Sequence, residues 1–185
     1  MTAENGDGTG VGAGILSFDP DSDTLNIGQS TTHNSMAMSI DNNEAVSINN
    51  RKFAVTSSTD GDFDGDVIYT GSTSTTVGKI YHYKSNGTWE EADANAAANC
   101  DGMLAVALGG NSTTNGMLLR GMVTLNHDPG NLGDVLFLSA AATGQATGTA
   151  PSGNGDIVRV IGYLLGGSNG QIYFNPDGTF VEVTA

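Results

Sequence analysis

The chain has 185 residues and a mass of 18.9 kDa, and 38% of its residues are hydrophobic, which suits one β-rich domain with an appendage. Six Lys and Arg residues stand against twenty Asp and Glu residues, so the formal net charge is −14. This excludes the basic face that nucleic acid or an anionic membrane surface requires. We therefore expect neither as a partner, and we expect the acidity to supply solubility.

The first segment, residues 1–14, is rich in glycine and polar residues and is predicted to be a flexible arm. It lacks a basic region followed by an apolar run, so we expect a protein made in the cytoplasm without a signal peptide. The single cysteine, Cys100, excludes an intrachain disulfide. No motif accompanies it, so we interpret it as a buried or incidental residue and not as a nucleophile.

Residues 15–59 consist of short alternating segments separated by Asp, Asn, Gly and Pro. In the segment at 45–48, for example, Val46 and Ile48 share one face and Ser47 lies opposite. Such strands expose one narrow apolar row, which is too little for an independent core. The pattern predicts an extended, β-rich arm or stem that packs on a partner or winds with sister chains.

Residues 60–185 carry a pattern that occurs twice and are predicted to form the head. GKIYHY (78–83), GMLAVALG (102–109) and GMLLRGMVTL (116–125) are followed about 55 residues later by GDVLFL (133–138), DIVRVIGYLLG (156–166) and GQIYFNPDG (170–178). Each set gives three short strands separated by polar loops. The chain is therefore predicted to be all-β, with a barrel or sandwich head built from two similar three-strand units.

Turn residues support this division. Asn86 and Gly87 predict a hairpin turn between KIYHYK and TWEEA, and Asn175 to Gly178 predict a turn after QIYF. The alanine-rich stretch at 92–100 has no convincing cap and is interpreted as a loop that crosses between strands.

Four carboxylates, Asp60, Asp62, Asp64 and Asp66, alternate with other residues and resemble the first half of a calcium loop. The twelfth position is Gly71, where a bidentate glutamate would complete the shell, and flanking helices are absent. The motif has two interpretations, a calcium site or an acidic turn at the start of the head. We expect no other cofactor.

Three aromatic residues, Tyr81, Tyr83 and Trp89, fall in one predicted hairpin. They could form a patch on which a sugar ring stacks, or they could fill a small β core. The loops at 109–116 and 139–156 are further candidates for glycan contact.

Catalytic motifs are missing from the sequence. Its glycine-rich stretch at 6–14 lacks the lysine of a phosphate loop, and no acid pair stands out. His33, His82 and His127 lie far apart without ligand spacing. We therefore expect a binding or structural protein and not an enzyme.

Several segments of the head together resemble bacteriophage virion proteins, especially those of marine and cyanobacterial phages. They are GDVIYTG (65–71), GKIYHY (78–83), TWEEADA (88–94), GMLAVALG (102–109), GMLLRGMV (116–123), GDVLFLS (133–139), VRVIGYLL (158–165) and IYFNPDGTFVEV (172–183). The resemblance covers about two thirds of the chain; residues 1–60 fall largely outside it. It implies a non-enzymatic module that decorates capsids or forms part of a fibre, and it carries over no catalytic residue.

These observations lead to one expected function and one alternative. The first is a capsid decoration (cement) protein on the virion, a homotrimer that bridges the major capsid protein or other virion proteins. The alternative is a head- or tail-fibre component that binds a host surface glycan.

Overall fold

The computed structural model describes residues 57–166 and 170–184 in full, together with the backbone of four short strands within residues 15–47. The chain divides into two compact units, residues 1–52 and residues 53–185. In the first unit, strands β1 (Ile15–Asp19), β2 (Thr24–Gly28), β3 (Met38–Ile40) and β4 (Val46–Ser47) pair in chain order as an antiparallel sheet. The predicted flexible arm, residues 1–14, lies outside the described residues.

The head, as described from residue 57 onward, is all-β, as predicted. Its strands are β5 (Phe63–Ile68), β6 (Ile80–Tyr83), β7 (Trp89–Glu91), β8 (Leu104–Ala107), β9 (Met117–Thr124), β10 (Val135–Leu138), β11 (Ala146–Thr147), β12 (Ile157–Val158), β13 (Val160–Gly166), β14 (Gln171–Phe174) and β15 (Val181–Glu182). The alanine-rich stretch is a loop, as predicted, with one 3-10 turn at Ala97–Asn99.

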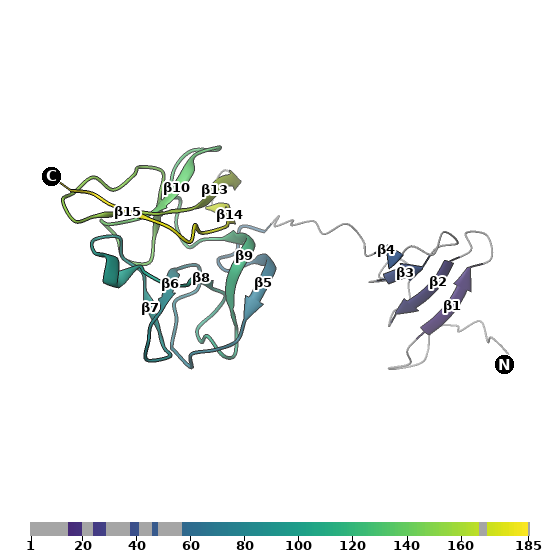
Figure 1. The fold of residues 1–185 in the computed structure, drawn as a ribbon. Coiled ribbons are helices and arrows are strands. Elements are labelled where there is room, and N and C mark those ends of the chain that lie inside the picture. Colours follow the sequence, from purple (N-terminus) through teal and green to yellow (C-terminus); the bar gives the residue numbers. More distant parts are fainter. Residues whose placement is uncertain are drawn as a thin grey trace. The chain divides into compact units, whose positions relative to one another are not determined.

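Nine of these strands form one antiparallel sheet that curls strongly into an open half-barrel (Figure 1). Eight lie in the order β11-β10-β13-β14-β9-β8-β6-β7, and β5 pairs with β9. The alternation of the sequence fits a barrel and a sandwich equally. The observed sheet is a single curled layer, which is an architecture intermediate between a closed barrel and a sandwich. Strands β12 and β15 form a separate two-stranded ladder.

The strand order is symmetric about the junction between β9 and β14, because each half holds the same four-strand arrangement. Each strand pairing of the first repeat has a counterpart in the second. The pair Tyr81–Glu91 corresponds to Phe137–Thr147, the pair Ile80–Val106 to Leu136–Gly162, and the pair Leu118–Val106 to Phe174–Gly162. In each comparison the second pair lies 56 residues after the first (137 minus 81, 162 minus 106, 174 minus 118). The doubled sequence pattern is thus a doubled fold. Each repeat has a fourth, short strand besides the three of the pattern: β7, which belongs to the predicted hairpin, and its counterpart β11.

The two repeats bury a common core on one face of the sheet, which we call the inner face. Its largest fully buried side chains include Ile80, Leu118, Leu136, Ile172 and Phe174, from both repeats. On the opposite, outer face the first repeat has a second cluster around Tyr81, Trp89 and Met117. Successive residues of a strand face opposite sides of the sheet, so Ile80 lies in the inner core and Tyr81 in the outer cluster.

Two glycines allow β5 to approach β9. Gly65 lies directly opposite Gly121, which has a φ of 141°. A Cβ on Gly65 would lie 2.2 Å from the Arg120 carbonyl oxygen, and one on Gly121 would lie 2.3 Å from the Asp64 carbonyl oxygen. No side chain fits in that space, so this crossing point requires glycine in both strands.

One buried cation, Arg159, ties two loops together. Its Nε donates to the Asp177 carbonyl (2.9 Å), its Nη1 to the Cys100 carbonyl (2.5 Å) and its Nη2 to the Gly102 carbonyl (2.9 Å). Only 3% of the residue is exposed, and burial lowers the pKa of its guanidinium. The contacts fix the loop before β8 against the loop after β14.

We expect Arg159→Leu to lower the free energy of unfolding by about 3 kcal/mol, because three carbonyls lose a buried donor. Chemical denaturation monitored by Trp89 fluorescence measures this. Lys84→Met is the matched control: Lys84 makes a surface ion pair with Glu90 (2.6 Å), whose loss should cost less than about 1 kcal/mol. Equal losses in the two variants would contradict the role assigned to Arg159.

Candidate functional site

The four carboxylates of the predicted calcium motif lie partly in a strand. Asp60 and Asp62 belong to the turn before β5, where the Asp62 amide donates to the Thr59 carbonyl (3.1 Å), and Asp64 and Asp66 lie within β5. Asp64 and Asp66 are alternate residues of this strand, so they share one face and are about 7 Å apart along the chain. Among the described residues of the head, no group of three or more acidic, histidine or cysteine side chains is arranged to hold a metal.

The three aromatic residues of the predicted glycan patch do come together. Tyr83 pairs with Trp89 across the β6–β7 hairpin, with ring centroids 4.8 Å apart, and Tyr81 lies on the same outer face. The predicted Asn-Gly turn closes this hairpin, since the Gly87 amide donates to the Lys84 carbonyl (3.0 Å). However, Tyr81 is only 4% exposed and Trp89 only 3%.

The segment 69–77 covers these rings. Trp89 Nε1 donates to the Thr70 carbonyl (3.0 Å), the Trp89 amide to Thr73 Oγ1 (3.0 Å), and the Thr76 amide to the Tyr81 hydroxyl oxygen (2.8 Å). Burial raises the pKa of the Tyr81 hydroxyl. Tyr81 and Trp89 therefore belong to a small second core, the other interpretation of the pattern, while Tyr83 packs against it and is half-buried.

A histidine on the inner face has an unusual environment. His82 is 1% exposed, and neither ring nitrogen has a hydrogen-bond partner among the described residues. Nε2 lies 3.6 Å from Glu90 Oε2 and Nδ1 lies 3.5 Å from Asp101 Oδ1, both beyond hydrogen-bond distance. At the positions 56 residues later, the second repeat pairs Leu138 with Ala146, so the fold itself does not require a polar pair here.

Cys100 is a buried residue, as expected. It is fully buried, and burial raises the pKa of its thiol to about 11. Its Sγ lies 3.4 Å from the Ala96 carbonyl, to which it donates. At neutral pH the thiolate is therefore scarce, and the residue is unsuited to act as a nucleophile.

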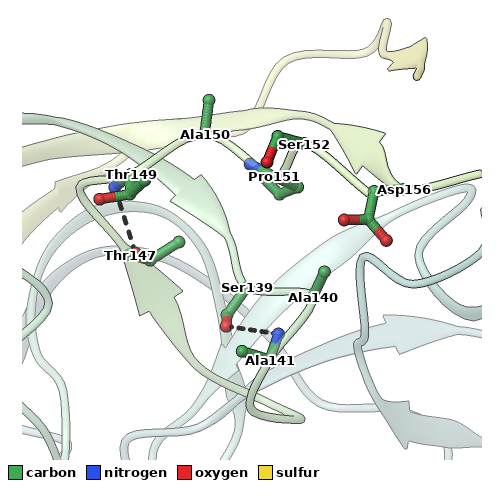
Figure 2. Close-up of a pocket in the computed structure, with 9 residues that line it drawn as sticks. All are labelled: Ser139, Ala140, Ala141, Thr147, Thr149, Ala150, Pro151, Ser152 and Asp156. Carbon is green, nitrogen blue, oxygen red and sulfur yellow. Dashed lines mark hydrogen bonds between the residues drawn. The ribbon is translucent and has the colours of Figure 1, made fainter. Parts of the chain in front are cut away.

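An open pocket of about 290 Å³ lies beside the β10–β11 hairpin. Its lining comes from the first residues of the hairpin turn and from the loop that leads to β12: Ser139, Ala140, Ala141, Thr147, Thr149, Ala150, Pro151, Ser152 and Asp156. Figure 2 shows the Asp156 carboxylate on one side of this hollow and the Thr147 and Thr149 side chains on the other. All nine residues lie within 139–156, one of the two loops predicted from the sequence as candidates for glycan contact.

Sequence reasoning missed two features of this region. The sequence pattern does not mark His82 as buried, because alternation cannot show which side of a strand faces the core. Arg159 was not singled out, because nothing in its neighbours marks a buried guanidinium. An alignment of the two repeats matches His82 with Leu138. It shows a histidine at a position where the other repeat has an apolar residue.

No protein-family model, curated protein or solved structure matches this chain. Within the described residues, no helix has the length and apolar character needed to span a membrane.

The internal repeat provides a test of His82. We expect His82→Leu, which copies Leu138, to leave the free energy of unfolding within about 1 kcal/mol or to raise it, because two unsatisfied buried nitrogens are removed. The reverse change, Leu138→His, should cost about 2 kcal/mol or more, since Ala146 offers the imidazole no partner. Thermal unfolding measures both. A loss above about 2 kcal/mol in His82→Leu would mean that the imidazole stabilises the fold.

His127 predicts a dependence of stability on pH. Burial lowers its pKa, and its Nε2 accepts a hydrogen bond from the Ala146 amide (2.9 Å), which a protonated ring cannot do. A group with a lowered pKa in the folded state stabilises the protein above its unfolded pKa of about 6.5 and loses that contribution as the pH falls.

We therefore expect the free energy of unfolding to decrease as the pH drops below about 6.5. In His127→Gln this decrease should be smaller, because Gln does not titrate and its side-chain oxygen can still accept the amide hydrogen. Denaturation series over this pH range compare the two proteins. An identical pH slope in both would contradict the assignment to His127.

Proposed function

We propose that the protein is a structural component of a bacteriophage particle, a capsid decoration (cement) protein that acts as a homotrimer on the virion surface. The resemblance of the head segments to phage virion proteins motivates this proposal. The observation that carries it is a bare apolar face on the second repeat.

This face is the outer side of strands β10, β13 and β14. Val135 lies opposite Tyr163, and Tyr163 lies opposite Tyr173, so the three side chains form a row across the strands. Val135 is 39% exposed, Tyr163 45% and the neighbouring Leu165 55%. Aromatic and aliphatic side chains gathered on one sheet face are typical of a protein–protein contact.

The first repeat shows how this chain treats the equivalent face. There Ala107 and Met117 stand at the positions of Tyr163 and Tyr173, 56 residues earlier, and both are buried in the cluster that contains Tyr81 and Trp89. Within the described residues of the head, the larger side chains of the second repeat remain exposed. A neighbouring subunit in an assembled shell would bury them.

A decoration protein stabilises a shell by adding contact area between neighbouring subunits, and it needs many copies and no catalytic group. In this proposal residues 15–59 dock on the major capsid protein and the heads meet around a threefold axis. The net charge of −14 would keep assembled particles apart in solution.

The alternative is a head- or tail-fibre component that binds a host glycan. One observation favours it, the open pocket between residues 139–141 and 147–156. The two functions differ in copy number, since a lattice decoration is abundant and a fibre is present in a small multiple of three.

The test is the number of copies of this chain relative to the major capsid protein in purified particles. We expect near-stoichiometric abundance, and we expect Leu165→Lys to reduce incorporation at least tenfold because it places a charge on the bare face. Val181→Lys, at a 67% exposed position on β15, is the matched control and should incorporate normally. A small multiple of three copies per particle would support the fibre alternative, and complete absence from particles would overturn both.

A further inference from the structure

The pocket beside the β10–β11 hairpin exists because the second repeat carries small residues at its turn. Ser139, Ala140 and Ala141 line it. In the first repeat the positions 56 residues earlier hold Tyr83, Lys84 and Ser85, which include two much longer side chains. The small residues at this turn are therefore not a requirement of the strand layout.

The walls of the pocket are held by their own hydrogen bonds. Asp156 Oδ2 accepts from the Gly153 amide (2.7 Å), Thr147 Oγ1 accepts from the Thr149 amide (3.1 Å), and Ser139 Oγ accepts from the Ala141 amide (3.1 Å). The Ser139–Ala141 and Thr147–Thr149 bonds are drawn in Figure 2. These bonds shape the loops without a ligand, so the pocket is formed in advance.

The polar groups left over suit a ligand with several hydroxyls. Ser139 Oγ accepts from the Ala141 and Ala142 amides and Thr147 Oγ1 from the Thr149 amide, and each hydroxyl still has its own hydrogen to donate. Ser152 adds a third hydroxyl, and the second carboxylate oxygen of Asp156 can accept a strong, charge-assisted hydrogen bond. Apolar surface comes from Pro151 and the alanine methyl groups.

We propose that this pocket binds one neutral sugar ring of a glycan. A volume of about 290 Å³ is at the small end of ligand pockets, so it holds one ring and not a drug-sized molecule. Asp156 would accept from the sugar hydroxyls, the serine and threonine hydroxyls would donate to sugar oxygens, and Pro151 would cover the C–H face. A divalent cation fits less well, because it needs several oxygen ligands of which more than one is usually anionic.

Binding to a single copy will be weak, because the pocket is open and has no aromatic ring on which the sugar could stack. Many copies on one particle would raise the overall affinity through multivalency. The site is separate from the bare apolar face, so it is compatible with a decoration protein as well as with a fibre.

The test uses the full-length protein and a panel of neutral monosaccharides, with binding followed by ligand-detected NMR and by amide chemical shifts. At least one sugar should bind, and Asp156→Asn should weaken it about tenfold by removing the charged acceptor, while Asn can still accept from the Gly153 amide. Asp128→Asn is the matched control, since Asp128 accepts from the Gly130 amide (3.2 Å) outside the pocket. An unchanged amide spectrum elsewhere shows that each variant is folded.

Three results would overturn the inference: no sugar in the panel binds, a sugar binds equally well to Asp156→Asn, or small primary amines bind and sugars do not. None of these results alters the copy number on particles. Failure of the sugar site and failure of the proposed decoration function can therefore be distinguished.

Discussion

The pairing of β9 with β14 is the contact on which the head depends. It joins the last strand of one repeat to the last strand of the other, through residues 121–124 and 171–174. Neither repeat could bury its inner face alone, because each offers only a short four-strand layer. Pairing the two at this junction makes one curled sheet whose inner residues share a core. β9 also accepts β5 along its length and β8 at its first two residues, so it organises the whole domain.

Because the fold is duplicated, the two repeats can be compared position by position. A residue type found in only one repeat is not required by the shared strand arrangement. Where the second repeat has Leu138 and Ala146, the first has His82 and Glu90. Where the first repeat has Tyr83 and Lys84, the second has Ser139 and Ala140 and hence a pocket. The strand order is the same in both repeats, although the pairing of β10 with β13 has a register shift that the pairing of β6 with β8 lacks. The side-chain differences are the natural places to look for function in a chain that lacks a recognisable catalytic motif.

The outer face of the sheet also differs between the two repeats. The first repeat buries its aromatic cluster beneath residues 69–77, with three hydrogen bonds to Trp89 and Tyr81. The second repeat exposes Tyr163 and Leu165. Burying an aromatic side chain removes a large apolar area from water, so an exposed row of this kind favours association. The proposed role in a virion depends on this asymmetry between two otherwise similar halves.

Much of the architecture followed from local sequence. Alternation determines strands, Asn86-Gly87 determines a hairpin, and the repeated pattern determines two equivalent units, since each depends on neighbouring residues only. The tertiary structure alone decided which face of each strand is buried, because a period of two is the same seen from either side. It placed Tyr81 and Trp89 in a core, extended Asp64 and Asp66 along a strand, and brought Arg159 to carbonyls nearly sixty residues away. Long-range contacts of this kind depend on how the sheet curls, and no short stretch of sequence contains that information.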